Sequence, residues 1–123
     1  MTDHILQGRR ILIVEDEYLL AAELEMELLD AEAIVLGPFG TVATAIEFIG
    51  TQQEIDGAIL DVNLRGEMIF QVADLLSERG VPFVLTTGYD ASLIPFRFQL
   101  SARCEKPTNM TQIKQVIGRL IKN

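Results

Sequence analysis

Short apolar runs rich in Ile and Val alternate along this chain with longer segments in which apolar residues recur every three or four positions. The short runs predict strands, and the longer segments predict amphipathic helices. We expect strands over residues 9–14, 33–36, 57–60, 83–86 and 101–105. We expect helices over residues 17–31, 41–50, 67–79 and 110–121. Because strands that alternate with helices through short connections align in parallel, the sequence predicts an α/β domain whose sheet is covered on both faces.

Turn residues between these segments support the same boundaries. Gly37-Pro38 closes the second predicted strand, and Thr41 suits the N-cap of the second predicted helix. The exception is segment 89–100, where the alternation requires a fourth helix but Pro95 removes a backbone donor from its middle. We therefore expect the fourth helix to be irregular, short or broken, with raised mobility.

The composition is that of one acidic globular domain. The chain has 123 residues, of which 49% are hydrophobic and 23% are charged, a balance typical of a folded soluble domain. Its net charge of −8 argues against nonspecific binding to nucleic acid or to an anionic membrane, because both need positive charge on the protein. No apolar run approaches the roughly 18 residues of a membrane span.

We expect residues 1–8 to form a flexible leader and residues 9–123 to form the domain, with no separate output domain after the last helix. The amino terminus lacks the apolar segment of a signal peptide. Cys104 is the only cysteine, so an internal disulfide is impossible. This fits a reducing compartment, and we expect a cytoplasmic protein.

Acidic residues and a lysine follow the predicted strands at the point where each strand ends. Glu15 and Asp16 follow the first strand, Asp61 follows the third, and Lys106 follows the fifth. Thr87, which follows the fourth strand, offers a hydroxyl donor. Because the carboxyl ends of parallel strands lie at one edge of a sheet, these side chains should converge on one crevice. Clustered carboxylates repel one another unless a cation or a shared proton offsets their charge.

Oxygen ligands of this kind suit Mg²⁺, which prefers one or two carboxylates plus water. Asp16 and Asp61 can supply the carboxylates, and the backbone carbonyl of Asn63 is placed to add a third ligand. Glu15 can bind through a water molecule. Lys106 can pair with a phosphate oxygen as a compact charge. A divalent cation, a lysine and an acceptor carboxylate together suggest phosphoryl chemistry.

Each feature also has a purely structural explanation when it is taken alone. An acidic tripeptide at the start of a helix is favourable at the helix dipole without any metal. Asp61 can be an N-cap or a turn residue, and Thr87-Gly88 can be a turn and no more. It is their joint appearance at successive strand ends that favours a functional site.

With these residues in place, the chain from about residue 10 to residue 123 resembles a receiver domain of two-component response regulators. The resemblance rests on Glu15-Asp16, Asp61, Thr87 and Lys106-Pro107. It implies a flavodoxin-like, doubly wound sheet of five parallel strands in the order 2-1-3-4-5. It also implies that Asp61 takes a phosphoryl group from a kinase histidine in a Mg²⁺-dependent reaction. By the same resemblance Asp16 is a direct metal ligand, Glu15 is an outer one, and Thr87 and Lys106 hold the phosphoryl oxygens.

A narrower resemblance is to the FAT-GUY receivers, whose signature PFxFATGY is similar to PFVLTTGY at residues 82–89. That group often works with histidine kinases of the HWE or a related type, and it lacks the aromatic switch residue of the fifth strand. This chain has Arg103 three residues before Lys106, where many receivers carry Tyr or Phe. Thr86 replaces the usual Ala of the group. These departures concern the output surface more than the phosphorylation site.

The leading hypothesis is a single-domain response regulator that is phosphorylated on Asp61 and acts through protein–protein contacts. It would not be an enzyme, although it would catalyse its own phosphorylation and dephosphorylation. Its expected partners are a sensor histidine kinase and a downstream protein. One alternative is a phosphate sink without output. Another is a small Mg²⁺-dependent aspartyl phosphatase, but such enzymes normally need a second acid where this chain has Asn63. A third alternative is a flavin carrier of the same fold, but this chain has no phosphate-cradling loop after the first predicted strand, where Glu15-Asp16 would repel the flavin phosphate.

Overall fold

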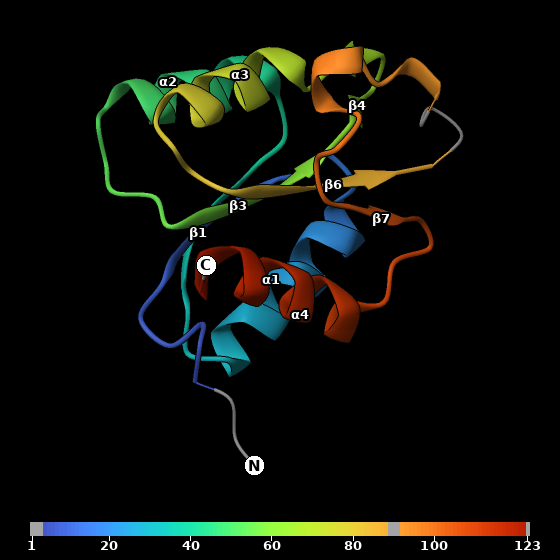
Figure 1. The fold of residues 1–123 in the computed structure, drawn as a ribbon. Helices are drawn as coiled ribbons and strands as arrows, with labels where there is room; N and C mark the ends of the chain where they lie inside the picture. The colour runs from blue at the N-terminus through green and yellow to red at the C-terminus, as the bar shows by residue number, and fades with distance from the viewer. Residues whose placement is uncertain (1–3, 89–91, 123) are drawn as a thin grey trace.

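The computed structural model describes residues 4–88 and 92–122, and within them five strands form one parallel sheet (Figure 1). In sheet order the strands are β2 (Ile34–Phe39), β1 (Arg10–Val14), β3 (Gly57–Asp61), β6 (Phe83–Thr87) and β7 (Arg103–Glu105). All four pairings between neighbouring strands are parallel. The predicted α/β fold and the strand order 2-1-3-4-5 are confirmed, with β6 and β7 as the fourth and fifth strands of the sheet.

Helices cover both faces of this sheet (Figure 1). On one face lie α2 (Val42–Gly50) and α3 (Phe70–Glu78). On the other face lie α1 (Tyr18–Asp30) and α4 (Met110–Lys122). No helix in the described part of the chain is long and apolar enough to cross a membrane.

The central strands read as unbroken apolar runs because both of their faces are covered. Along β1, Leu12 and Val14 belong to the apolar cluster under α2 and α3, while Ile11 and Ile13 belong to the cluster under α1 and α4. Successive side chains of a strand point to opposite faces of the sheet. A strand with both faces covered therefore needs an apolar residue at every position. The result is a rigid layer from which the residues at the strand ends project.

β2 continues to Phe39, whereas we expected it to end at Leu36 before Gly37-Pro38. The Gly37-Pro38 peptide bond is cis, and Gly37 has a φ of 99°. Proline can lie within this strand because β2 is at the edge of the sheet, where a missing backbone donor does not break a central ladder. The extension matters for the site, because the Phe39 carbonyl accepts a hydrogen bond from the backbone N–H of Glu15 at 2.9 Å.

A small antiparallel hairpin precedes α3, where we expected the helix itself to begin at Glu67. β4 (Asn63–Leu64) pairs with β5 (Glu67–Met68), and α3 begins only at Phe70. The turn of this hairpin consists of Arg65 and Gly66, whose φ angles are 53° and 94°. Two consecutive residues in this left-handed region cannot belong to a right-handed helix, so the helix starts later than its apolar pattern indicates.

Segment 89–100 was predicted to hold an irregular fourth helix, and residues 89–91 of it lie outside the described residues. Residues 96–98 form a short 3-10 helix, η2 (Phe96–Phe98), directly after Pro95. Both nitrogen-to-oxygen contacts between Arg97 and Asp74 on α3 are 2.9 Å long. The Phe98 ring stacks on Phe70 with 5.8 Å between centroids, while Phe96 is almost fully exposed. An irregular element is therefore present, and its raised mobility stays a prediction.

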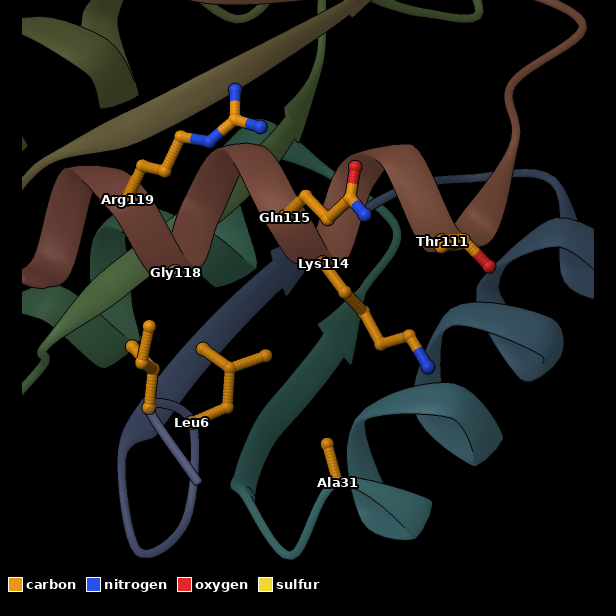
Figure 2. Close-up of a pocket in the computed structure, with 8 residues that line it drawn as sticks. Leu6, Ala31, Thr111, Lys114, Gln115, Gly118 and Arg119 are labelled. Atoms are coloured by element: carbon orange, nitrogen blue, oxygen red, sulfur yellow. The ribbon is translucent and has the colours of Figure 1, made fainter. Parts of the chain in front are cut away.

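Residues 4–8 of the expected leader lie against the domain. Leu6 is buried in the cluster under α1 and α4, and Gly8 donates a backbone hydrogen bond to the carbonyl of Glu32 at 2.9 Å. Leu6 also helps to line a pocket of about 390 Å³ between this segment, Ala31 at the end of α1, and Gly118 on α4 (Figure 2). Residues 1–3 are not among the described residues, and the boundary between leader and domain at residue 9 stays a prediction.

Candidate functional site

Three carboxylates meet at the carboxyl end of the sheet. Glu15 and Asp16 directly follow β1, and Asp61 is the last residue of β3, the strand that pairs with β1. One side-chain oxygen from each of the three residues lies within 4.8 Å of the other two. Glu15 and Asp61 are almost completely buried, while Asp16 lies nearer the surface. The structure thus brings together the acidic residues that the sequence placed at separate strand ends.

Lys106 lies against two of these carboxylates. It follows β7, and its Nζ is 3.1 Å from Asp61 Oδ1 and 3.6 Å from Glu15 Oε1. Its backbone N–H donates to the carbonyl of Thr87 at 2.6 Å, which ties the loop after β7 to the end of β6. The Lys106-Pro107 peptide bond is cis. Lys106 thus reaches the carboxylates from beyond β7, which is separated from β3 by β6 in the sheet.

The electrostatics of the site follow from burial and from this ion pair. Burial is the main cause that raises the pKa of Glu15 to about 7, with the nearby charge of Asp61 adding to it. Burial also raises the pKa of Asp61 above its ordinary value, although Lys106 opposes this shift. Burial acts to lower the pKa of Lys106, but the charges of Asp61 and Glu15 outweigh it and raise that pKa. Lys106 therefore stays charged, and the acids need more positive charge nearby to be fully ionised.

Thr87 supplies an unused donor beside the carboxylates. It ends β6 and is fully buried, and within the described residues its hydroxyl has no hydrogen-bond partner. The Thr86 hydroxyl, next to it in the strand, is buried and unpartnered in the same part of the structure. Buried polar groups in folded proteins are nearly always paired. An unpaired hydroxyl at the end of the strand next to Asp61 is suited to donate to an oxygen of a bound group.

Asn63 lies in β4, two residues after Asp61. Its backbone N–H points to Asp61 Oδ1 at 3.4 Å, and its side-chain oxygen accepts from the N–H of Gly66 at 2.5 Å. The side chain is therefore engaged in shaping the hairpin turn. The predicted use of the Asn63 carbonyl as a metal ligand stays a prediction.

Arg65 is a member of the site that the sequence did not indicate. Its Nε lies 3.2 Å from Asp16 Oδ2. In the sequence, an arginine next to a glycine is typical of an ordinary exposed turn. It is the hairpin of β4 and β5 that brings Arg65 to Asp16. A glycine at position 66 favours a turn, but no local pattern gives the direction of the neighbouring side chain.

The donor set fits a hard divalent cation. The cluster of Glu15, Asp16 and Asp61 can hold a metal ion, because it offers oxygen atoms alone and they lie close together. Oxygen ligands at short range are the preference of Mg²⁺, whereas the described part of the site presents neither the imidazole nor the thiolate that favour zinc. The buried Glu15 Oε1, which has no hydrogen-bond partner in the described residues, leaves further acceptor capacity for metal-bound water.

Glu15 is expected to make the metal-free protein less stable as the pH rises from about 4.5 to about 7. An unfolded glutamate titrates near 4.5, whereas folded Glu15 keeps its proton to about 7. Between these values the folded state binds more protons, so the free energy of unfolding falls with pH, by about 3 kcal/mol in all. Urea unfolding in a chelator, at about pH 5 and about pH 7.5, should show this fall in the wild type.

The matched variant for this measurement is Glu15→Gln, which cannot titrate and should show a much flatter dependence. Asp61 also has a raised pKa and contributes a fall of the same sign to both proteins. Glu23→Gln on the exposed face of α1 serves as the control and should follow the wild type. Identical slopes for wild type and Glu15→Gln would show that Glu15 is not the group that titrates.

Known structures resemble this chain over almost its whole length. It is 37% identical to SdrG from Sphingomonas melonis Fr1, whose solution structure matches with a TM-score of 0.79 over 94% of this chain and 98% of that one. The BeF3-activated conformation of SdrG from Pseudomonas melonis Fr1 matches at 36% identity with a TM-score of 0.74, covering 98% of this chain and 99% of that chain. A response regulator receiver protein from Sinorhizobium medicae WSM419 matches at 27% identity, with a TM-score of 0.81 and coverage of 95% and 97%. No protein-family model and no curated protein sequence matches the chain.

Proposed function

Since the chain belongs to the receiver domains of two-component response regulators, we propose that it accepts a phosphoryl group from a histidine kinase on Asp61 and then acts through contacts with another protein. The observation that carries this proposal is the position of Asp61. It is a buried carboxylate with a lysine 3.1 Å away and two further acids close by. This combination gives a nucleophile, a fixed positive charge and a place for a divalent cation within one crevice.

The chemistry assigned to Asp61 is a displacement at phosphorus. A carboxylate oxygen of Asp61 forms a bond to the phosphorus atom, and the bond from phosphorus to the donor's imidazole nitrogen breaks, leaving the electron pair on that nitrogen. Lys106 holds one phosphoryl oxygen by charge, and the unpartnered Thr87 hydroxyl donates to another. Asp16 and Asp61, with the Asn63 carbonyl and with Glu15 through water, would hold Mg²⁺. Bound Mg²⁺ would neutralise charge on the transferring group.

Lys106 also prepares Asp61 for this role. A carboxylate attacks only in its ionised form, and burial by itself would favour the protonated form. The ammonium group at 3.1 Å opposes that shift and keeps a negative charge accessible in a site that excludes most water. The same ammonium then faces the charge that the phosphoryl group brings.

The phosphatase alternative has weaker support. Such an enzyme needs a general acid two residues after its nucleophile. The residue there is Asn63, whose amide is too weak an acid for this role and whose side-chain oxygen accepts from Gly66 within the hairpin turn. The distinction between signalling output and a phosphate sink depends on a downstream partner. We propose that an output exists, and that the kinase is of the HWE or a related type.

Beryllofluoride, a mimic of the phosphoryl group, is expected to slow amide exchange over residues 92–100. Thr87 lies just upstream of this segment, so a phosphoryl oxygen that engages its hydroxyl pulls on the start of the segment. The segment has few regular backbone hydrogen bonds, so its opening free energy is low and easily changed. Hydrogen exchange by mass spectrometry, with Mg²⁺ alone and with Mg²⁺ plus beryllofluoride, measures the difference.

Amides of α2, which contacts the edge strand β2 on the other side of the sheet from β7, serve as the internal control and should not change. Unchanged exchange over residues 92–100 would contradict the proposed route from Asp61 to an output surface. Strong protection in both states would show a rigid segment that cannot be the switch.

A further inference from the structure

Two cations divide the three carboxylates of the site between them. Lys106 contacts Asp61 and Glu15, at 3.1 and 3.6 Å. Arg65 contacts the third carboxylate, with its Nε 3.2 Å from Asp16 Oδ2. Without Arg65, Asp16 would be the carboxylate whose charge is least compensated by the described residues. Arg65 therefore removes part of the repulsion that three adjacent acids create.

The hairpin fixes where Arg65 can reach. Its strands β4 and β5 pair, the turn is closed by the N–H of Gly66 on the side chain of Asn63, and Leu64 is buried in the core. Arg65 and Gly66 both have positive φ angles, 53° and 94°, so the tip of the turn has a left-handed backbone. The turn is thus anchored to Asn63, two residues after Asp61, and its tip carries the guanidinium that contacts Asp16.

The contact is nevertheless easy to exchange. The side chain of Arg65 is 83% exposed, and that of Asp16 is 17% exposed. Ion pairs with one partner this exposed are weak, since water and salt screen them. The hairpin therefore fixes the backbone of Arg65, while its side chain is held by one weak ion pair. A side chain held in this way can move away from Asp16 when a divalent cation binds there.

We propose that Arg65 is a resident counterion of Asp16 that a divalent cation has to displace, so that Arg65 sets the metal affinity of the site. This inference rests on the proposed function, which makes Asp16 a ligand of Mg²⁺. A metal bound by Asp16 brings two positive charges next to the guanidinium. Mg²⁺ must therefore either push Arg65 aside or bind against its repulsion, and both routes weaken the apparent affinity.

The test is the affinity of the protein for Mg²⁺, measured by titration calorimetry at low ionic strength. Arg65→Gln should bind Mg²⁺ about fivefold more tightly than the wild type, the factor that corresponds to an exposed ion pair at the upper end of its usual strength. Arg65→Lys should lie between them, because it keeps the charge but loses the guanidinium geometry. Glutamine and lysine have a Cβ, as arginine does, so neither changes the backbone demand at position 65.

Two controls separate this effect from net charge and from structure. Arg119→Gln on the exposed side of α4 makes the same change in net charge and should leave the affinity at the wild-type value. Raising the ionic strength should shrink the difference between wild type and Arg65→Gln, since an exposed pair is screened by salt. A purely structural role of Arg65 would give no such salt dependence.

Equal affinities for wild type and Arg65→Gln would overturn the inference, and so would weaker binding by Arg65→Gln. In both cases a wild type that binds Mg²⁺, beside an Asp16→Asn variant that does not, would leave the proposed function standing. Absence of Mg²⁺ binding in the wild type would overturn the inference and the proposed metal site together.

Discussion

Replacing Asp61 with asparagine is expected to abolish phosphorylation of the protein by a small phosphodonor. With acetyl phosphate and Mg²⁺, the wild type should gain the mass of one phosphoryl group, and Asp61→Asn should gain none. An amide oxygen carries no negative charge and cannot form the acyl phosphate, so the rate should fall at least about a thousandfold. Intact-mass spectrometry over a time course measures both proteins in the same way.

The matched control is Asp30→Asn at the exposed end of α1, which should be phosphorylated like the wild type. Asparagine at position 61 keeps the size of the side chain, so the variant is expected to fold, and circular dichroism checks this. A phosphoryl group found on Asp61→Asn in the wild-type amount would place the acceptor on another residue and overturn the proposed function.

Replacing Lys106 with methionine is expected to destabilise the protein by about 3 kcal/mol near pH 8, a large part of the stability of a small domain. Methionine keeps most of the side-chain volume but leaves Asp61 and Glu15 buried without the ammonium that offsets their charge. Without it, the pKa values of both acids rise further. The loss should therefore shrink as the pH is lowered, because protonation of the two acids removes the charge that Lys106 offsets.

Urea unfolding of wild type and Lys106→Met near pH 8 and at lower pH measures this effect. Lys114→Met on α4 is the control, because Lys114 pairs with Glu27 at 2.8 Å near the surface. Its partner Glu27 is far more exposed than Asp61 and Glu15, so loss of this pair should cost less than about 1 kcal/mol. A pH-independent loss in Lys106→Met would indicate lost packing instead of uncompensated charge.

The sheet and the meeting of the acids were predictable because both depend on local signals that the topology combines. Apolar runs mark the strands, and the residue after each run marks its carboxyl end. Parallel alignment then brings Asp16, Asp61 and Lys106 to one edge without any knowledge of side-chain angles. The burial of Glu15 and Asp61 follows from the same placement, since the ends of central strands are covered on both faces.

The features that the sequence did not reveal depend on tertiary structure. β2 passes through Gly37-Pro38 because an edge strand tolerates a missing donor, and its position at the edge is a property of the whole sheet. The apolar pattern around Met68 and Ile69 is helical in period, but the left-handed turn at Arg65 delays the helix. The contact from Arg65 to Asp16 joins two loops, and no spacing along the chain encodes it.

Both outer strands of the sheet are poor templates for another chain. β2 contains a proline, and β7 has only three residues. A strand of another protein can add to an exposed sheet edge through backbone hydrogen bonds, and this kind of binding depends little on most side chains. Because neither edge strand favours such pairing, a partner has to recognise this protein through side chains on its helices and loops. Its choice of partner can then change by a few surface substitutions, while the backbone that holds Asp61 stays as it is.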